Sequence, residues 1–326
     1  MFSRSQLRER CRPLLFGKVE ALQKLATACV DAGVIEPSLG NLVSVATAEE
    51  GFALPATGPL PVIELEAPQT NDPIGKPCAA FGLASTEANL RAGQLCLSGG
   101  ADLVVTPPIH KESMHLAGYP YEGQTQMFGE LSGSRRYGML ACSGDLRVLI
   151  ATRHMALREA LDRLEIGLVA KQIRIAHESA RETLGLDNPR VVLAGLNPHA
   201  GESGAFGKEE TKVLLPAIER AKQEWGFETA GPAVPDIVFG EGRDGHWDVV
   251  VALYHDQAFI PLRLLGRERA WTLLVGAKGL LRVSPMHGSA YDLAAKGPGS
   301  ADPEPFAFAV ERGLELAMQK IAEASV

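Results

Sequence analysis

Four apolar stretches rich in Val, Leu, Ile and Ala stand out along the chain. They run over Leu103–Thr106, Arg147–Thr152, Arg190–Gly195 and Trp247–Leu253. Continuous apolar runs, as opposed to runs that alternate with polar residues, are typical of strands buried on both faces of a sheet. We therefore predict four buried strands at these positions.

Longer stretches with helical spacing lie between and after these strands. Met155–Leu184, Lys208–Trp225 and Asp302–Ala324 are predicted helices, and the last opens with an Asp-Pro-Glu sequence that is typical of a helix start. The segment Val43–Pro77 is rich in Pro, Gly, Thr and Ala and predicts short strands and loops. Alternating strands and helices predict an α/β fold.

Composition narrows the class of protein. The composition, 46% hydrophobic and 22% charged, is that of an ordinary globular protein, and 326 residues are enough for two domains or one large α/β unit. The net charge of -7 disfavours a nucleic-acid partner, so an anionic ligand would need a local group of Arg and Lys. No stretch reaches the roughly 20 apolar residues of a membrane-spanning helix, and we expect no membrane partner.

The five cysteines and the N-terminus indicate where in the cell the protein is expected to be. The cysteines include no CxxC pair and are odd in number, which favours reduced thiols over a disulfide framework. The basic N-terminus lacks the apolar core and cleavage site of a secretory signal. We therefore expect a cytoplasmic protein.

Three histidines follow predicted strands. His154, His199 and His255 each lie within four residues of the carboxyl end of an apolar run. Ligands bind outside these ends in α/β sheets, and imidazole is a common ligand of zinc and other first-row divalent ions. We predict that the three hold one divalent ion, although each taken alone is also explained by a loop or strand-capping role. His177 and His246 are predicted to be a helix-surface and a loop residue.

Several other residues are candidates for binding anions or a cofactor. Lys111 follows the first strand, where a cation could meet a phosphate or carboxylate, and a solvated loop lysine explains it equally well. Gln124 and Thr125 offer an amide and a hydroxyl on a turn, and Arg263 and Arg282 suit bidentate anion recognition. The small residues of His287-Gly288-Ser289-Ala290 would let a ligand approach the backbone, or would simply form a turn.

Several common signatures are missing from the sequence. No G-x-G-x-x-G follows a strand and no phosphate-binding P-loop occurs, so the usual dinucleotide fingerprint is absent. The sequence also lacks the G-x-S-x-G of serine hydrolases and a recognisable cysteine nucleophile. These classes of enzyme are therefore disfavoured.

Five motifs in order resemble the 4-hydroxythreonine-4-phosphate dehydrogenase family of pyridoxal phosphate biosynthesis. They are Thr106–Lys111 (TPPIHK), His115–Pro120 (HLAGYP), Leu196–Glu202 (LNPHAGE), Tyr254–Gln257 (YHDQ) and Ser284–Ala290 (SPMHGSA). The resemblance extends from about Ala80 to the C-terminus. The last motif is also similar to the cofactor loop of isocitrate and isopropylmalate dehydrogenases.

The resemblance implies a two-domain α/β/α subunit of the isocitrate/isopropylmalate dehydrogenase-like type. We expect residues 1–117 plus 293–326 to form the first domain. Residues 118–292 would form the second and carry most of the metal and substrate residues. The resemblance also implies a homodimer, with the active site in the interdomain cleft and the metal at the subunit interface.

The resemblance assigns roles to the candidate residues. His154, His199 and His255 match metal ligands, with Zn, Mg or Co as the ion. The predicted catalytic residues are Lys111 and Asp236, the predicted substrate ligands are Gln124, Thr125, Arg263 and Arg282, and the predicted NAD or NADP loop is His287, Gly288, Ser289 and Ala290. The family oxidises the C3 hydroxyl of 4-phosphohydroxy-L-threonine, a small anionic hydroxy acid, and the product then loses carbon dioxide.

The sequence departs from the family at four places. Gln124 stands where the family has His, and Arg263 where it has Lys. The family's substrate-binding Asn is replaced near Thr272 or Leu273, and its N-terminal glycine-rich loop is not found. Two alternatives therefore stay open: a paralogous dehydrogenase of a phosphorylated threonate, a phosphorylated erythronate or an aromatic cis-dihydrodiol, and a catalytically impaired metal-binding homologue.

Overall fold

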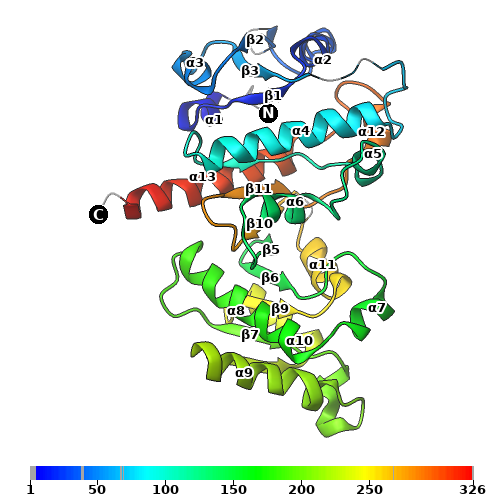
Figure 1. Cartoon of the computed structure of the whole chain (residues 1–326), viewed down its shortest axis with the longest axis vertical. Coiled ribbons are helices and arrows are strands. Elements are labelled where there is room, and N and C mark those ends of the chain that lie inside the picture. The colour runs from blue at the N-terminus through cyan, green and yellow to red at the C-terminus, as the bar shows by residue number, and fades with distance from the viewer. Residues whose placement is uncertain (1–4, 38–39, 67, 69, 267, 325–326) are drawn as a thin grey trace. The chain divides into compact units, whose positions relative to one another are not determined.

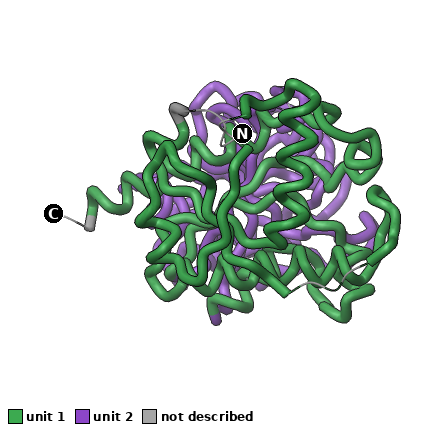
Figure 2. Tube along the Cα trace, turned by 90° about the horizontal axis from the view of Figure 1, so that it is seen from above, with its two compact units in different colours: residues 1–132, 279–326 green, residues 133–278 purple. Residues whose placement is uncertain are grey.

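The computed structural model describes residues 5–37, 40–66, 68, 70–266 and 268–324. The chain forms two compact units, shown in Figure 2: unit 1 is Met1–Ser132 with Gly279–Val326, and unit 2 is Gly133–Lys278. The sequence predicted the domain limits at 117/118 and 292/293, whereas these two units divide at 132/133 and 278/279. Segments 118–132 and 279–292, which carry several predicted substrate and cofactor residues, therefore belong to unit 1.

Unit 1 contains a three-stranded parallel sheet in the order β1-β3-β2 and, outside that sheet, the parallel strands β4 and β11. The sheet consists of β1 (Leu15–Gly17), β2 (Leu42–Val45) and β3 (Leu60–Glu64). The pair consists of β4 (Val104–Val105) and β11 (Arg282–Pro285). In that pair Arg282 lies opposite Val104, which places the arginine at the start of β11.

Helices surround these strands (Figure 1). They are α1 (Ser5–Arg10), α2 (Val19–Asp31), α3 (Ala48–Ala53), α4 (Ala79–Leu97), α5 (Lys111–Leu116), α6 (Gln124–Leu131), α12 (Tyr291–Ala294) and α13 (Glu304–Ala324). Gly82 of α4 lies against the backbone of α5, and a Cβ added there would lie 1.8 Å from the carbonyl oxygen of Ser113. Only glycine therefore permits this contact, which fixes the helix that begins at Lys111.

Unit 2 is built on six strands in the order β10-β5-β6-β9-β7-β8. They are β5 (Gly138–Ser143), β6 (Leu146–Ile150), β7 (Val191–Ala194), β8 (Thr229–Ala233), β9 (Val249–Ala252) and β10 (Ala270–Val275). The pairs β10/β5 and β5/β6 are antiparallel, whereas β6, β9, β7 and β8 run parallel. Every residue of β7 and β9 is buried, which explains their continuous apolar sequences.

The helices of unit 2 pack on this sheet (Figure 1). They are α7 (Leu157–Asp162), α8 (Ile166–Glu182), α9 (Leu215–Trp225), α10 (Pro235–Arg243) and α11 (His255–Leu264). A turn of π-helix, Glu210–Leu214, leads into α9. The single helix predicted over Met155–Leu184 is two helices, since the backbone of Glu165 between them is extended.

The α/β prediction is confirmed, with strands somewhat shorter than the apolar runs that predicted them. Helices α1, α2, α4, α5, α6, α10, α11 and α12 were not predicted, and α3 lies in the segment that was expected to hold only short strands and loops. Thr47 caps α3 by accepting from the N–H of Glu50, and the Glu50 carboxylate accepts from the N–H of Ala46. This Thr-x-x-Glu pattern is a known helix-start signal. No helix in the described ranges has the length and hydropathy to span a membrane.

Candidate metal site and anion site

The carboxyl ends of β6, β9 and β7 meet at one edge of the sheet of unit 2, because these three neighbouring strands run parallel. His154, His199 and His255 follow β6, β7 and β9 respectively. Their elements therefore lead to the same edge, the usual place for a ligand in a parallel sheet.

Two of the three imidazoles lie together. The ring centroids of His154 and His255 are 5.1 Å apart, and the rings are inclined at 50°. An imidazole nitrogen bound at about 2.0–2.1 Å places its ring centroid about 3.2 Å from the ion, so two such rings at a tetrahedral angle have centroids about 5.2 Å apart. The centroid separation of this pair therefore matches that of two imidazoles on one divalent ion.

His199 lies in an unusual turn. The five residues 199–203 all have positive φ, with His199 at φ 53° and Ala200 at φ 51°. Such a run is unfavourable for residues that carry a Cβ, so the surrounding structure has to hold it in place. Within the described residues of one chain, no three His, Cys, Asp or Glu side chains are placed to hold a metal. The three-histidine site stays a prediction.

Glu210 holds the turn that carries His199. Its Oε1 accepts hydrogen bonds from the N–H of Leu196 at 2.9 Å and of Asn197 at 2.8 Å, and its Oε2 accepts from Nδ2 of Asn197 at 2.8 Å. Burial alone would raise the pKa of Glu210, but the hydrogen bonds from Asn197 and Leu196 lower it overall. A Cβ at residue 201 would lie 2.7 Å from this carboxylate, which explains Gly201.

Glu210 was not predicted as a site residue, since nothing at the start of a predicted helix marks one glutamate as buried. Its partners precede it by 13 and 14 residues, and the fold brings them together. The Asn-Pro-His-Ala-Gly sequence nevertheless signals a tight polar turn, whose free N–H groups need an acceptor. A search for such an acceptor could have found it.

Arg263 shares a helix face with His255. Along α11 the ring of His255 stacks on Phe259 at 4.3 Å, and the guanidinium of Arg263 lies over the same Phe259 ring at 5.6 Å. Arg263 is exposed, so its charge is available to a ligand. Asp236 is exposed in the first turn of α10, a helix that packs against the segment Pro198–Gly204.

Arg282 of unit 1 is a buried cation, with only 2% of its surface exposed. Its Nε donates to Oγ1 of Thr106 at 2.9 Å and its Nη2 donates to Oε1 of Gln124 at 2.6 Å. Burial lowers the pKa of Arg282 to about 9. No ion pair among the described residues involves this guanidinium, so an anionic ligand would be its natural partner.

Gln124, predicted to bind substrate, makes several contacts within the protein. Besides accepting from Arg282, its Nε2 donates to Oδ1 of Asn89 at 2.9 Å and to the carbonyl oxygen of Pro107 at 3.0 Å. The amide therefore orients the Arg282 guanidinium. Its direct contact with a substrate stays a prediction.

Lys111 and Thr125 border the same turn. The Cε of Lys111 lies 3.6 Å from where a Cβ on Gly123 would be, and Thr125 lies in the first turn of α6. Burial lowers the pKa of Lys111, while the nearby Glu122 raises it in part. Two cationic side chains thus flank Gly123 and Gln124, beside the N-terminus of α6, whose N–H groups favour anions.

The predicted cofactor loop lies in unit 1. His287 and Gly288 are exposed, and Ala290 has φ 50°, a left-handed conformation that is uncommon for alanine. The next residue, Tyr291, stacks on His110 at 4.2 Å and lies 3.2 Å from Oγ of Ser113. These contacts connect the loop to the segment that carries Lys111.

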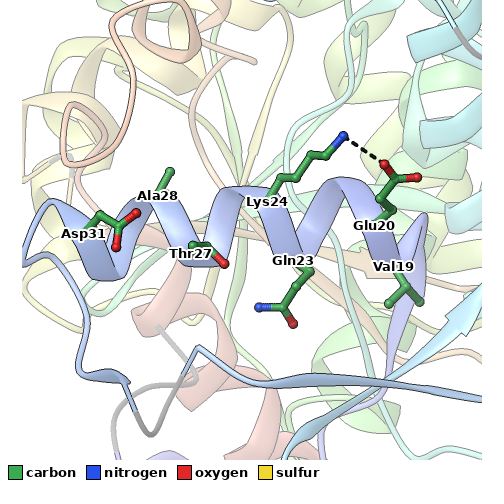
Figure 3. Close-up of a pocket in the computed structure, with 7 residues that line it drawn as sticks. All are labelled: Val19, Glu20, Gln23, Lys24, Thr27, Ala28 and Asp31. Carbon is green, nitrogen blue, oxygen red and sulfur yellow. Dashed lines mark ion pairs between the residues drawn. The ribbon is translucent and has the colours of Figure 1, made fainter.

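Two further features lie away from these residues. The hollow drawn in Figure 3 lies along α2, where an ion pair joins Lys24 and Glu20 at 2.8 Å. It includes none of the predicted site residues.

The prediction that His177 is a helix-surface residue is wrong: this histidine is 3% exposed, stacks on Phe227 and lies 2.9 Å from Oγ1 of Thr229. Helical periodicity alone could not show that this face of α8 is covered. His246 is exposed in a loop, as predicted.

The chain is similar to known proteins over most of its length. Residues 9–312 match the family model described as pyridoxal phosphate biosynthetic protein PdxA. A 4-hydroxythreonine-4-phosphate dehydrogenase of Beijerinckia indica is 37% identical over 273 residues, 82% of this chain and 80% of the relative. A D-threonate 4-phosphate dehydrogenase of Salmonella typhimurium is 40% identical over 243 residues, 74% of this chain and 73% of the relative. Among solved structures, 4-hydroxythreonine-4-phosphate dehydrogenase from Klebsiella pneumoniae has a TM-score of 0.80 at 31% identity, covering 97% of this chain and 95% of that one.

Proposed function

Because the chain belongs to the PdxA family of pyridoxal phosphate biosynthetic proteins, we propose that it is an NAD(P)-dependent dehydrogenase of 4-phosphohydroxy-L-threonine. In this reaction the C3 hydroxyl is oxidised and the β-keto acid formed loses carbon dioxide. The observation that carries the proposal is the buried guanidinium of Arg282, which has no carboxylate partner among the described residues. A phosphorylated hydroxy acid supplies the anion that this cation lacks.

Each group of residues has a role in the proposed reaction. Lys111, Thr125 and Arg282 bind the anionic groups of the substrate, and Gln124 orients Arg282. Arg263 adds a further positive charge. The loop His287–Ala290 would hold NAD or NADP, which when bound would supply the hydride acceptor.

We further propose that His154, His199 and His255 hold a divalent ion, with zinc, magnesium or cobalt as candidates. The fit of the His154–His255 pair to a shared ion supports this proposal. Such an ion would act as a Lewis acid toward the substrate oxygen. Neutral imidazole ligands leave the charge of the ion undiminished. Lys111, whose pKa burial lowers, and Asp236 are the proposed proton-handling residues.

Assembly and location complete the proposal. By its resemblance to the family, the protein is a homodimer in which the partner subunit completes the metal site. Sedimentation should then give a dimer at micromolar concentration, and a fully active monomer would contradict this. The five cysteines are free thiols, which supports a cytoplasmic location.

A second substrate is D-threonate 4-phosphate, which the Salmonella typhimurium relative is named for. The observation that favours it is Gln124, which stands in place of the family's histidine and contacts Arg282. Both candidates carry a phosphate and a hydroxyl, so the anion site alone does not discriminate between them.

A substrate panel tests these proposals. The purified protein is incubated with each phosphorylated acid, with NAD or NADP and with each divalent ion, and reduced cofactor is followed by its absorbance. We expect turnover of 4-phosphohydroxy-L-threonine that requires an added ion. Turnover confined to D-threonate 4-phosphate would select the second candidate. No reduction of either cofactor with either acid would refute both.

A further inference from the structure

The buried face of α4 in unit 1 carries a polar residue at its middle. The buried residues of this helix, three or four positions apart, are Gly82, Thr86, Asn89, Gly93 and Cys96. Gly82 lies against the backbone of α5, and Gly93 lies against the ring of Phe128 in α6. Asn89 stands between these two contacts and is 8% exposed. Asn is a weak helix former, and a buried amide costs free energy unless it is hydrogen-bonded, so this residue needs partners.

The orientation of the Asn89 amide is fixed by the backbone of its own helix. Its Nδ2 donates to the carbonyl oxygen of Ser85, one turn earlier in α4, at 2.6 Å. A carbonyl oxygen only accepts, so this contact decides which end of the amide is the nitrogen. The oxygen of Asn89 is therefore the end that faces Gln124, and it accepts from Nε2 of Gln124 at 2.9 Å.

The orientation of the Gln124 amide follows from that of Asn89. Both hydrogens of its Nε2 have an acceptor, one in Asn89 and one in the carbonyl oxygen of Pro107 at 3.0 Å. Its Oε1 is thereby turned toward Arg282 and accepts from Nη2 at 2.6 Å. An amide turned by 180° would set N–H groups against a guanidinium, which only donates. Each donor in this series meets an acceptor, from the backbone of α4 to the buried cation.

We propose that Asn89 is a positioning residue of the anion site, which holds the Gln124 amide in the orientation that keeps Arg282 in place for the substrate. The inference rests on the proposed function, in which Arg282 binds an anionic group of the substrate. It assigns Asn89 no contact with the substrate.

A purely local role is the alternative. The side chain of an Asn inside a helix can bond to the carbonyl four residues earlier, and the contact with Ser85 does so. That role leaves out the contact with Gln124, which lies 35 residues away in sequence. The two roles differ in one measurable way: only a residue that acts through Gln124 loses its effect when the Gln124 amide is removed.

The test is a double-mutant cycle on substrate affinity. Asn89→Leu, Gln124→Met and the double variant are compared with the wild type. Asn89→Ala is a second variant, because alanine favours the helix and should fold even where leucine does not. Thr86→Val is the control, because Thr86 is fully buried on the same face of α4 and its Oγ1 has no hydrogen-bond partner within the part of the chain that the structure describes.

The affinity for 4-phosphohydroxy-L-threonine is measured by titration calorimetry on the full-length protein. Every sample contains the same concentration of divalent ion and no NAD or NADP, so that no turnover occurs. The same series is repeated with D-threonate 4-phosphate. Circular dichroism checks that each variant is folded.

We expect Asn89→Leu and Asn89→Ala to weaken binding about threefold to tenfold, the range for one neutral hydrogen bond. In the Gln124→Met background the same changes should alter the affinity less than about twofold, because no amide is left to orient. Thr86→Val should bind like the wild type.

An equal loss of affinity with and without Gln124 would overturn the inference, because Asn89 would then act through α4 alone. Wild-type affinity in both folded Asn89 variants, or the same loss in Thr86→Val, would also overturn it. In each of these cases the proposed anion site survives if Arg282→Met abolishes binding. A wild-type protein that binds neither acid would refute both proposals.

Discussion

Replacing Arg282 by Met separates a functional from a structural role for this buried cation. The guanidinium contacts Thr106, Gln124 and the ring of Phe128, and no carboxylate pairs with it among the described residues. Burial lowers its pKa from the ordinary range of arginine to about 9, which corresponds to a penalty of roughly 5 kcal/mol on the charged form. The substitution removes that penalty.

The substitution also removes hydrogen bonds to two partners, each worth about 1.5–3 kcal/mol because the donor is charged. The free energy gained by removing the burial penalty and the free energy lost with the hydrogen bonds nearly cancel. The free energy of unfolding of ligand-free Arg282→Met should therefore lie within about 2 kcal/mol of the wild type. Breaking a buried arginine–carboxylate pair would instead cost about 3–5 kcal/mol.

Urea unfolding with and without substrate measures both effects. At a substrate concentration of about 100 times Kd, the wild type should gain about 2.7 kcal/mol, and Arg282→Met should gain almost nothing. Arg8→Met is the control, since Arg8 is also buried in unit 1 and donates to the carbonyl oxygen of Gly58. It should keep the full ligand-induced gain. A ligand-free loss of 3–5 kcal/mol in Arg282→Met, or an undiminished ligand effect, would refute the reasoning.

Three further predictions concern other residues. Glu210→Gln should lower the free energy of unfolding by about 1.5–3 kcal/mol, because one amide oxygen cannot accept all three N–H groups; an unchanged urea midpoint would contradict this. Burial lowers the pKa of His177 to about 4, so as the pH falls the unfolded chain binds a proton before the folded chain does. The free energy of unfolding should therefore fall by about 3 kcal/mol as the pH is lowered from about 6.5 to about 4. His177→Gln should flatten that part of the stability profile, and an unaltered profile would show that other groups cause it. Gln124→His should raise turnover of 4-phosphohydroxy-L-threonine relative to D-threonate 4-phosphate, by changing the partner of Arg282; a constant ratio would show that residue 124 does not select the substrate.

Three of the six strands of unit 2, β6, β7 and β9, were predicted from the sequence, for a physical reason. β7 and β9 are covered on both faces, so each of their side chains must be apolar and the run is visible without knowledge of the fold. The break between α7 and α8 was not visible, because the apolar spacing continues on both sides of Glu165. Periodicity detects a buried face and does not detect a change in helix direction.

The candidate sites were predictable only in part. His154 and His255 could be paired, because each follows a strand and parallel neighbours share an edge. Glu210 and Asn89 could not be assigned partners, because their hydrogen bonds reach residues that only the fold brings near. The division of the chain into two units after Ser132 and Lys278 also could not be predicted from the apolar patterns.

Metal stoichiometry tests the central claim most directly. Purified wild-type protein and the variants His154→Ala, His199→Ala and His255→Ala are each equilibrated with zinc, and bound metal per subunit is measured by elemental analysis after removal of free ion. The proposal predicts one ion per subunit in the wild type and a sharp loss in all three variants, with each still folded by circular dichroism. Wild-type metal content in any folded variant would remove that histidine from the site, and its persistence in all three would contradict the account.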